Sequence, residues 1–225
     1  MHDVTLPFVD RAAAGKALAR LLLAYRGRPE VIVLALPRGG VPVGYEVASE
    51  LGVELDLMIV RKLGVPWYPE LAMGAIAIAS GGVRVLNDDV LRMHGVDAHA
   101  LETVERKESA ELHRRERAYR GQRPVSQLAG RQVILVDDGL ATGATMLAAV
   151  RAVRQQAPAA IVVAVPVAPA EVLEELRHEV DEVVCPFTPE PFSAIGRWYL
   201  DFSQTSDAEV VELLQRAWRR EAGEA

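Results

Sequence analysis

The sequence has little of what marks several large classes of protein. Cys185 is the only cysteine among 225 residues, so an intrachain disulfide and a cysteine-based metal cage are both excluded. No apolar run approaches the roughly 20 residues of a membrane-spanning helix. The N-terminal segment also lacks the basic and apolar regions of a signal peptide. We therefore expect a cytoplasmic protein with no membrane partner.

Basic residues are also in deficit. Lys and Arg total 25 against 31 Asp and Glu, which gives a formal net charge of −6. Nucleic acids and anionic membranes bind to basic surfaces that release counterions, so nucleic acid is not expected as a partner. The chain is 50% hydrophobic and 25% charged, the balance of a globular protein with one sizeable core.

Short aliphatic runs alternate with longer amphipathic stretches, which predicts an α/β fold with an open, mainly parallel sheet flanked by helices. The expected strands are 31–36, 55–60, 133–136, 161–167 and 182–185, and the expected helices are 10–26, 41–51, 144–156, 169–179 and 207–220.

A further pair of strands is expected outside the parallel core. Residues 75–79 and 83–86 flank Ser80-Gly81-Gly82, the signature of a β-hairpin. Residues 97–120 follow as a long, highly charged helix. This helix is interpreted as a solvated element lying over the domain, and the alternative is that its arginines close over an anionic ligand.

The most informative segment is 133–145. Four apolar residues form a buried strand, Asp137 and Asp138 follow it, and a loop then ends in Thr-Gly-Ala-Thr before a helix. A parallel strand delivers such a loop to the carboxyl edge of the sheet, where α/β folds bind their ligands. Gly143 lets backbone amides approach a bound group, and the new helix directs free N–H groups at an anion. The segment therefore predicts a phosphate site.

Adjacent carboxylates beside a phosphate site suit a ligand that also offers hydroxyl groups and brings a divalent cation. Carboxylates accept hydrogen bonds from a vicinal diol and stabilise a nearby cationic centre. The segment is not a Walker loop, because no Lys follows the second glycine, and it lacks the spacing of a dinucleotide fingerprint. The alternative is an acidic strand-to-helix turn capped by Thr.

Four hydrophobic residues, two acids and a loop ending in Thr-Gly-Ala-Thr resemble the motif with which type I phosphoribosyltransferases bind 5-phosphoribosyl-1-pyrophosphate (PRPP). The resemblance implies one phosphoribosyltransferase-like domain over 1–225. It places a β-hairpin and helical insertion at about 64–120, and a small C-terminal hood and helix at about 186–220. It also implies Mg²⁺ as cofactor, and a homodimer is expected because dimers are common in this family.

The resemblance assigns roles to residues of the motif. Asp137 and Asp138 would be the catalytic carboxylates, which hold the ribose hydroxyls directly or through Mg²⁺ and stabilise positive charge on the ribose. The loop that binds the 5′-phosphate would consist of Ala141, Thr142, Gly143, Ala144 and Thr145.

A second loop would bind pyrophosphate, in this family often through a non-proline cis peptide. Pro37-Arg38-Gly39-Gly40 matches its position, after one strand and before a helix. Arg38 supplies charge, and Gly39 and Gly40 expose amides to an anion. Lys62, at the expected end of the second strand, is a further candidate contact. The alternatives are a turn without a ligand and an exposed basic strand end.

Family members carry a hood over the nucleobase where this chain has the aromatic stretch 187–199. Phe192, Trp198 and Tyr199 are the base-stacking candidates, and the alternative is that they pack on the core. Members that act on 6-oxopurines generally have an acid at the position of Ala141. The alanine argues against hypoxanthine and guanine, and the acceptor base stays open.

The implied function is transfer of a phosphoribosyl group from PRPP to a nitrogenous base with release of pyrophosphate. PRPP and a nucleobase or similar acceptor would be the small-molecule partners. One alternative is a non-catalytic regulatory protein that senses PRPP, and another is a different sugar-phosphate or nucleotide enzyme on a similar sheet.

Overall fold

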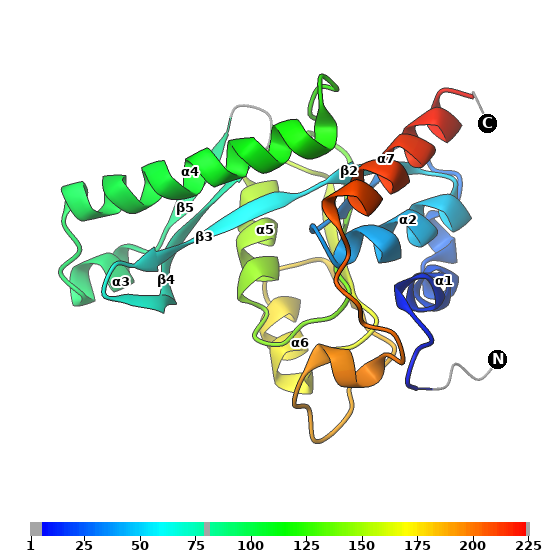
Figure 1. Cartoon of the computed structure of the whole chain (residues 1–225). Helices are drawn as coiled ribbons and strands as arrows, with labels where there is room; N and C mark the ends of the chain where they lie inside the picture. The colour runs from blue at the N-terminus through cyan, green and yellow to red at the C-terminus, as the bar shows by residue number, and fades with distance from the viewer. Residues whose placement is uncertain (1–5, 79–81, 224–225) are drawn as a thin grey trace.

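The computed structural model describes residues 6–78 and 82–223. Its centre is a parallel sheet with helices on both faces, and an antiparallel sheet crossed by a long helix extends to one side (Figure 1). The parallel strands are β1 (Val31–Ala35), β2 (Glu54–Leu57), β6 (Gln132–Val136), β7 (Ala160–Ala164) and β8 (Glu182–Val184), in the order β2-β1-β6-β7-β8. The predicted fold class is confirmed.

Alternation along the central strands builds a core on each face of this sheet. Val31 and Val33 of β1 join one hydrophobic cluster, and Ile32 and Leu34 join the other. Strands buried on both faces appear as continuous aliphatic runs, which is why the sequence revealed them. The first face is covered by α1 (Arg11–Leu21), α2 (Gly40–Leu51) and α7 (Asp207–Glu221), and the second by α5 (Ala144–Arg154) and α6 (Ala170–Arg177).

The second sheet contains β3 (Ile59–Val65), β4 (Tyr68–Ile78) and β5 (Val83–Leu86), all antiparallel. The expected single strand 55–60 is wrong, because β2 ends at Leu57 and the chain enters the other sheet at Ile59. Met58 between them is 1% exposed. The hydrophobic run of the sequence therefore continues from β2 through Met58 into β3, although β2 pairs with β1 and β3 pairs with β4.

The hairpin strands are confirmed as β4 and β5, and the expected turn residues Ser80 and Gly81 lie outside the described residues. A short helix that the sequence analysis missed, α3 (Asp88–Met93), follows β5. The long charged helix is α4 (Ala98–Arg120), and Figure 1 shows it lying along the antiparallel sheet.

The C-terminal end of α4 is fixed to the core by a buried ion pair. The Arg120 side chain is 2% exposed, and its Nη1 lies 2.5 Å from Asp56 Oδ1 and 2.6 Å from Oδ2. Ser126 Oγ donates a further hydrogen bond of 2.8 Å to Asp56 Oδ2. This helix is therefore anchored at its end as well as solvated along its exposed face.

The irregular segment after β8 packs against the N-terminal segment. Phe8 N donates to Trp198 O at 2.8 Å and Leu200 N donates to Phe8 O at 2.7 Å. The rings of Phe8, Phe187, Tyr199 and Phe202 form an aromatic cluster there. Short 3₁₀ helices cover Leu23–Tyr25 and Ile195–Trp198. Across the described residues, no helix is both long and apolar enough to cross a membrane.

Candidate active site

The two predicted ligand loops leave neighbouring strands at the same edge of the sheet. Strands β1 and β6 pair in parallel, with Ala35 opposite Val136. The loop 37–40 follows the first strand, and Asp137 follows the second directly. The carboxyl ends of adjacent parallel strands are the place where α/β sheets bind ligands.

The two loops touch at positions that only glycine can fill. A Cβ atom on Gly39 would lie 2.0 Å from Asp138 Oδ2, and one on Gly40 would lie 2.7 Å from Val136 O. The Pro37–Arg38 peptide bond is cis, at the place that the family resemblance indicated. The basic loop and the acidic pair therefore form one continuous surface.

The two carboxylates of the acidic pair have different surroundings. Asp138 Oδ2 accepts a hydrogen bond of 2.8 Å from Arg11 Nε, whereas Asp137 has no ion pair within the described part of the chain. Burial raises the pKa of Asp137 well above its ordinary value, and the neighbouring Asp138 charge adds to the effect. Burial also raises the pKa of Asp138, although the Arg11 guanidinium opposes that shift.

Arg11 is a site residue that the sequence analysis missed. Its side chain is 12% exposed, its Nη1 donates to Ser203 O at 2.7 Å, and its guanidinium carbon lies 4.0 Å from the centre of the Phe202 ring. The first helix thus supplies the positive charge beside Asp138. No local pattern around position 11 distinguishes this arginine from an ordinary helix residue.

The predicted 5′-phosphate loop is open to solvent. Ala141, Thr142, Ala144 and Thr145 are exposed, and α5 begins at Ala144. Gly143 has φ +71°, a left-handed conformation that favours glycine. Thr142 Oγ1 accepts a long hydrogen bond of 3.5 Å from Ala144 N. The first turn of α5 therefore begins at an accessible surface, as an anion site at a helix N-terminus requires.

Arg38 of the basic loop reaches the start of α7. Its Nη1 lies 3.4 Å from Asp207 Oδ1, which also accepts a 2.7 Å hydrogen bond from Tyr119 Oη. That hydrogen bond from Tyr119 lowers the pKa of Asp207, and burial raises the pKa of Tyr119 to about 12. The ion pair with Asp207 holds the Arg38 side chain at the start of α7, with about a third of that side chain exposed.

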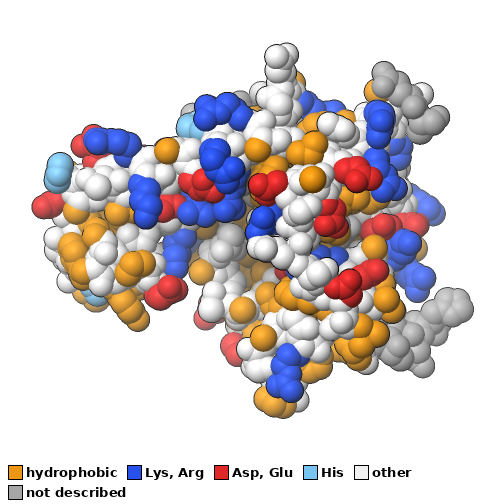
Figure 2. Space-filling view, in the orientation of Figure 1, with side chains coloured by type: hydrophobic (Ala, Val, Ile, Leu, Met, Phe, Trp, Pro, Cys, Tyr) orange, Lys and Arg blue, Asp and Glu red, His pale blue; other side chains and the backbone are white. Residues whose placement is uncertain are grey.

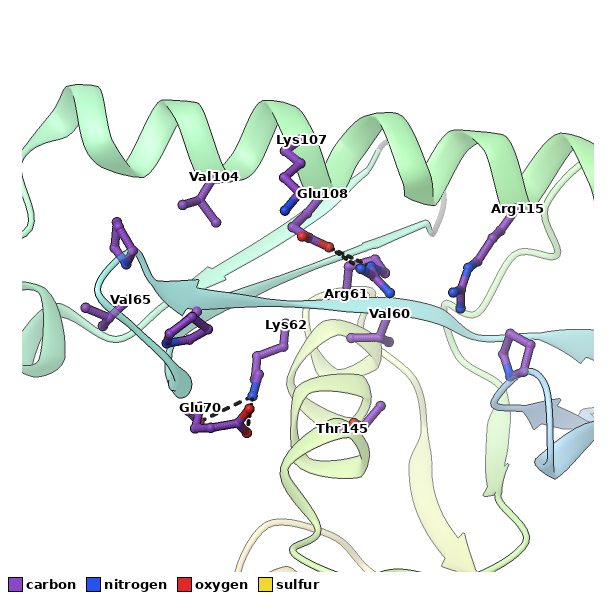
Figure 3. Close-up of a pocket in the computed structure, with 14 residues that line it drawn as sticks. Val60, Arg61, Lys62, Val65, Glu70, Val104, Lys107, Glu108, Arg115 and Thr145 are labelled. Carbon is purple, nitrogen blue, oxygen red and sulfur yellow. Dashed lines mark hydrogen bonds and ion pairs between the residues drawn. The ribbon is translucent and has the colours of Figure 1, made fainter. Parts of the chain in front are cut away.

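Lys62 reaches the site from a different element than expected. It does not end the second parallel strand; it lies within β3, opposite Ala75 of β4. Its Nζ is 3.5 Å from Glu70 Oε2, and it lines a cleft together with Pro37 and Thr145 (Figure 3). The residue therefore lines the same cleft as one residue of each predicted ligand loop, with its side chain directed toward Glu70 (Figure 3).

The aromatic candidates divide into two groups. Tyr199 is 5% exposed, packed between the rings of Phe8 and Phe202, with centroids 5.5 Å and 5.0 Å away. Its Oη donates to Asp138 O at 2.6 Å, so the structure gives it a positioning contact and no free ring face. Phe192 and Trp198 are half-buried, with ring centres 6.4 Å apart.

An acidic pair, an exposed glycine loop and a basic loop thus lie at one edge of a parallel α/β sheet, the edge where such folds bind their ligands. Comparison with known families agrees, because the model of the phosphoribosyl transferase domain matches residues 10–193. The chain belongs to this family.

Two similar proteins come from bacteria. A protein of Mycobacterium tuberculosis, provisionally named a phosphoribosyl transferase and found in two strains, is 50% identical over 212 residues. The match covers 94% of this chain and 47% of the relative, so the chain spans about half the length of the curated relatives it matches. The crystal structure of TT1426 from Thermus thermophilus is 44% identical with a TM-score of 0.84, covering 94% of this chain and 99% of that one.

Proposed function

We propose that this chain transfers the phosphoribosyl group of PRPP to a nitrogenous base and releases pyrophosphate. The contact between Gly39 and Asp138 carries the proposal, because it joins a basic loop to an acidic pair at the end of adjacent parallel strands. A ligand that offers a pyrophosphate to one loop and a diol to the other fits this surface. Membership of the phosphoribosyl transferase family supports the same interpretation.

The acidic pair also fits Mg²⁺. Asp137 is a carboxylate whose pKa burial raises, and the described residues place no cationic side chain within ion-pair distance of it. Oxygen ligands and phosphate groups are the ligands that Mg²⁺ prefers, and one or two carboxylates are its usual protein contribution. Asp137 and Asp138 would hold the ion, directly or through water. Bound there, Mg²⁺ would supply positive charge to the departing pyrophosphate.

The chain's own residues would act mainly by position and charge. The amides of 141–145 would bind the 5′-phosphate, and Arg38 with the amides of Gly39 and Gly40 would receive the pyrophosphate as the C1–O bond breaks. The carboxylates would stabilise positive charge on the ribose, with Arg11 fixing one oxygen of Asp138. Lys62 is proposed as a further pyrophosphate contact.

Phe192 and Trp198 are the proposed hood contacts to the acceptor base. Both side chains are half-buried, so each keeps part of its ring open to a ligand.

Calorimetric titration with PRPP, with and without Mg²⁺, followed by a pyrophosphate-release assay over a panel of bases, tests this proposal. We expect Mg²⁺-dependent binding in the wild type and its loss when Asp137→Asn is combined with Asp138→Asn. The matched control combines Asp88→Asn with Asp89→Asn, an adjacent exposed pair in α3. Unchanged PRPP affinity in the 137/138 variant would remove the acidic pair from the site.

The release assay separates a transferase from a PRPP-binding regulator. A transferase releases pyrophosphate in the presence of one base of the panel, and the release requires the acidic pair. Binding of PRPP without release on any base would contradict the transferase proposal. Arg38→Ala should weaken pyrophosphate more than ribose 5-phosphate, and equal losses would exclude Arg38 from the leaving-group site.

A further inference from the structure

A cleft of about 550 Å³ opens between the antiparallel extension and helix α4. One end meets the basic loop at Pro37 and the phosphate loop at Thr145, and the other end reaches Pro66 and Val104. Figure 2 shows the surface hollowed between the extension and the core, with charged side chains gathered along α4 above the hollow. Its volume is that of a small-molecule pocket. Pyrophosphate alone would fill only a small part of it.

Positive charge predominates in the cleft although the whole chain is acidic. Four basic side chains line it against two carboxylates: Arg61, Lys62, Lys107 and Arg115 against Glu70 and Glu108. A carboxylate outside the lining, Glu111 of α4, also pairs with Arg115, whose Nε lies 2.8 Å from its Oε1.

The ion pairs within the cleft leave part of this charge uncompensated. Arg61 Nε is 2.7 Å from Glu108 Oε2, and Lys62 is paired with Glu70. Both lining carboxylates are therefore already paired with lining cations. Lys107 has no carboxylate within 4.0 Å in the described part of the chain, and Figure 3 shows it directed from α4 toward the cleft. An excess of cations between low-dielectric walls attracts anions.

The outer wall of the cleft is apolar. Val65, Pro66 and Pro69 of the β3–β4 hairpin line it, together with Val104 of α4. Val104 and Lys107 are three residues apart on one helix, so a hydrophobic and a cationic side chain share the face that looks into the cleft. A ligand that combines an anionic group with a planar or apolar body would use both.

We propose that this cleft binds a second ligand, a phosphate ester with an apolar body such as a nucleoside diphosphate, beside the PRPP loops. Lys107 and Arg115 contact its phosphate groups, and the valine and proline wall contacts its body. If the proposed function holds, this ligand lies beside PRPP in a cleft whose lining contains neither Phe192 nor Trp198, the residues proposed to contact the acceptor base. The binding site itself does not depend on that function.

The test is calorimetric titration with adenosine diphosphate (ADP), pyrophosphate and adenosine, each without PRPP. We expect ADP to bind about tenfold more tightly than either fragment, because only ADP uses both the cations and the apolar wall. Lys107→Glu should weaken ADP about tenfold and leave PRPP binding within about twofold. The matched control is Arg106→Glu, because Arg106 is an adjacent, 74% exposed residue of α4 outside the cleft lining.

Variants of the acidic pair distinguish ligand binding in the cleft from ligand binding at the PRPP site. The variant with Asp137→Asn and Asp138→Asn should lose PRPP binding and retain ADP binding, whereas Lys107→Glu should do the opposite. Loss of ADP binding in the 137/138 variant would place ADP in the PRPP site and overturn the proposal. Equal effects of the two charge reversals, or ADP affinity no higher than that of pyrophosphate, would also overturn it. Failure of the wild type to bind PRPP would contradict the proposed function alone.

Discussion

Replacing Arg11 by methionine tests the electrostatic design of the acidic pair. Methionine keeps the unbranched apolar part of the side chain, but it removes the charge beside Asp138, the hydrogen bond to Ser203 O and the guanidinium contact with the Phe202 ring. Asp138 would then be a largely buried carboxylate with another carboxylate, Asp137, next to it. We expect the folded protein to lose stability and the pKa of Asp138 to rise further.

The magnitude follows from the burial of the pair. Opposite unit charges about 4 Å apart attract by about 4 kcal/mol at an effective dielectric constant of about 20, and desolvation offsets part of this. Removing one partner of a buried pair costs about 3–5 kcal/mol. The side chains of Arg11 and Asp138 keep 12% and 11% of their exposure, so we expect the lower part of that range. A loss of about 3–4 kcal/mol lowers Tm by roughly 6–16 °C in a chain of this length.

The pH dependence of the stability loss in Arg11→Met shows whether the charge of Asp138 is its cause. The stabilisation by Arg11 requires an ionised Asp138, so it is present above the pKa of Asp138 in the folded protein and disappears as the pH falls through that pKa. Urea unfolding should therefore show a larger difference in the free energy of unfolding between wild type and Arg11→Met above the folded-state pKa of Asp138 than below it. Arg20→Met, an exposed position of the same helix, should change the free energy of unfolding by no more than about 0.5 kcal/mol.

A double-mutant cycle tests whether Arg11 stabilises the protein through Asp138. Asp138→Asn combined with Arg11→Met should cost less than the sum of the single changes, with a coupling energy of about 1–3 kcal/mol. Additive effects, or a destabilisation that does not change with pH, would show that Arg11 does not act through the charge of Asp138.

Three further predictions concern the core and the loops. Asp137→Asn should raise the free energy of unfolding of the ligand-free protein by roughly 1 kcal/mol, because the raised pKa makes the ionised form costly. Denaturant titration should find this gain absent below about pH 4, growing as the pH rises toward the folded-state pKa, and constant above that pKa. Arg120→Met should destabilise by about 3–5 kcal/mol in urea, and adding Asp56→Leu should restore most of the loss. Gly39→Ala should abolish PRPP binding in calorimetry with an unchanged circular dichroism spectrum, because its Cβ would meet Asp138 Oδ2 at 2.0 Å.

The sequence predicted the elements whose signal is local. The strands β1 and β6 are buried on both faces and appear as unbroken aliphatic runs. The division between β2 and β3 was invisible, because the run continues through the buried Met58 while the partner strand changes. Helix α3 was missed although Asn87, with Asp88 after it, is a recognisable helix start. Its six residues show too little periodicity to reveal a helix.

The residues of the candidate site also divide into those that a local sequence pattern indicates and those that depend on contacts between distant parts of the chain. Asp137, Asp138 and the glycine loops lie in contiguous motifs, so their residue types and spacing were enough to indicate them. Arg11 contacts Asp138 across 127 positions of the chain, and no short pattern records such a contact. Tyr199 was found as an aromatic residue of the hood, but its burial and its bond to Asp138 O depend on how the segment folds back.

The contacts around Asp138 also have a consequence for the order in which the protein matures on the ribosome. Arg11 precedes every strand of both sheets along the described chain, whereas Tyr199 and Ser203 follow all of them. A nascent chain that has emerged only through β8 can pair all of its strands, yet Asp138 O lacks its hydroxyl donor and the Arg11 guanidinium lacks its carbonyl acceptor. The surroundings of the acidic pair are therefore completed only after residues 199–203 have been translated, later than the motif and every strand of the described chain.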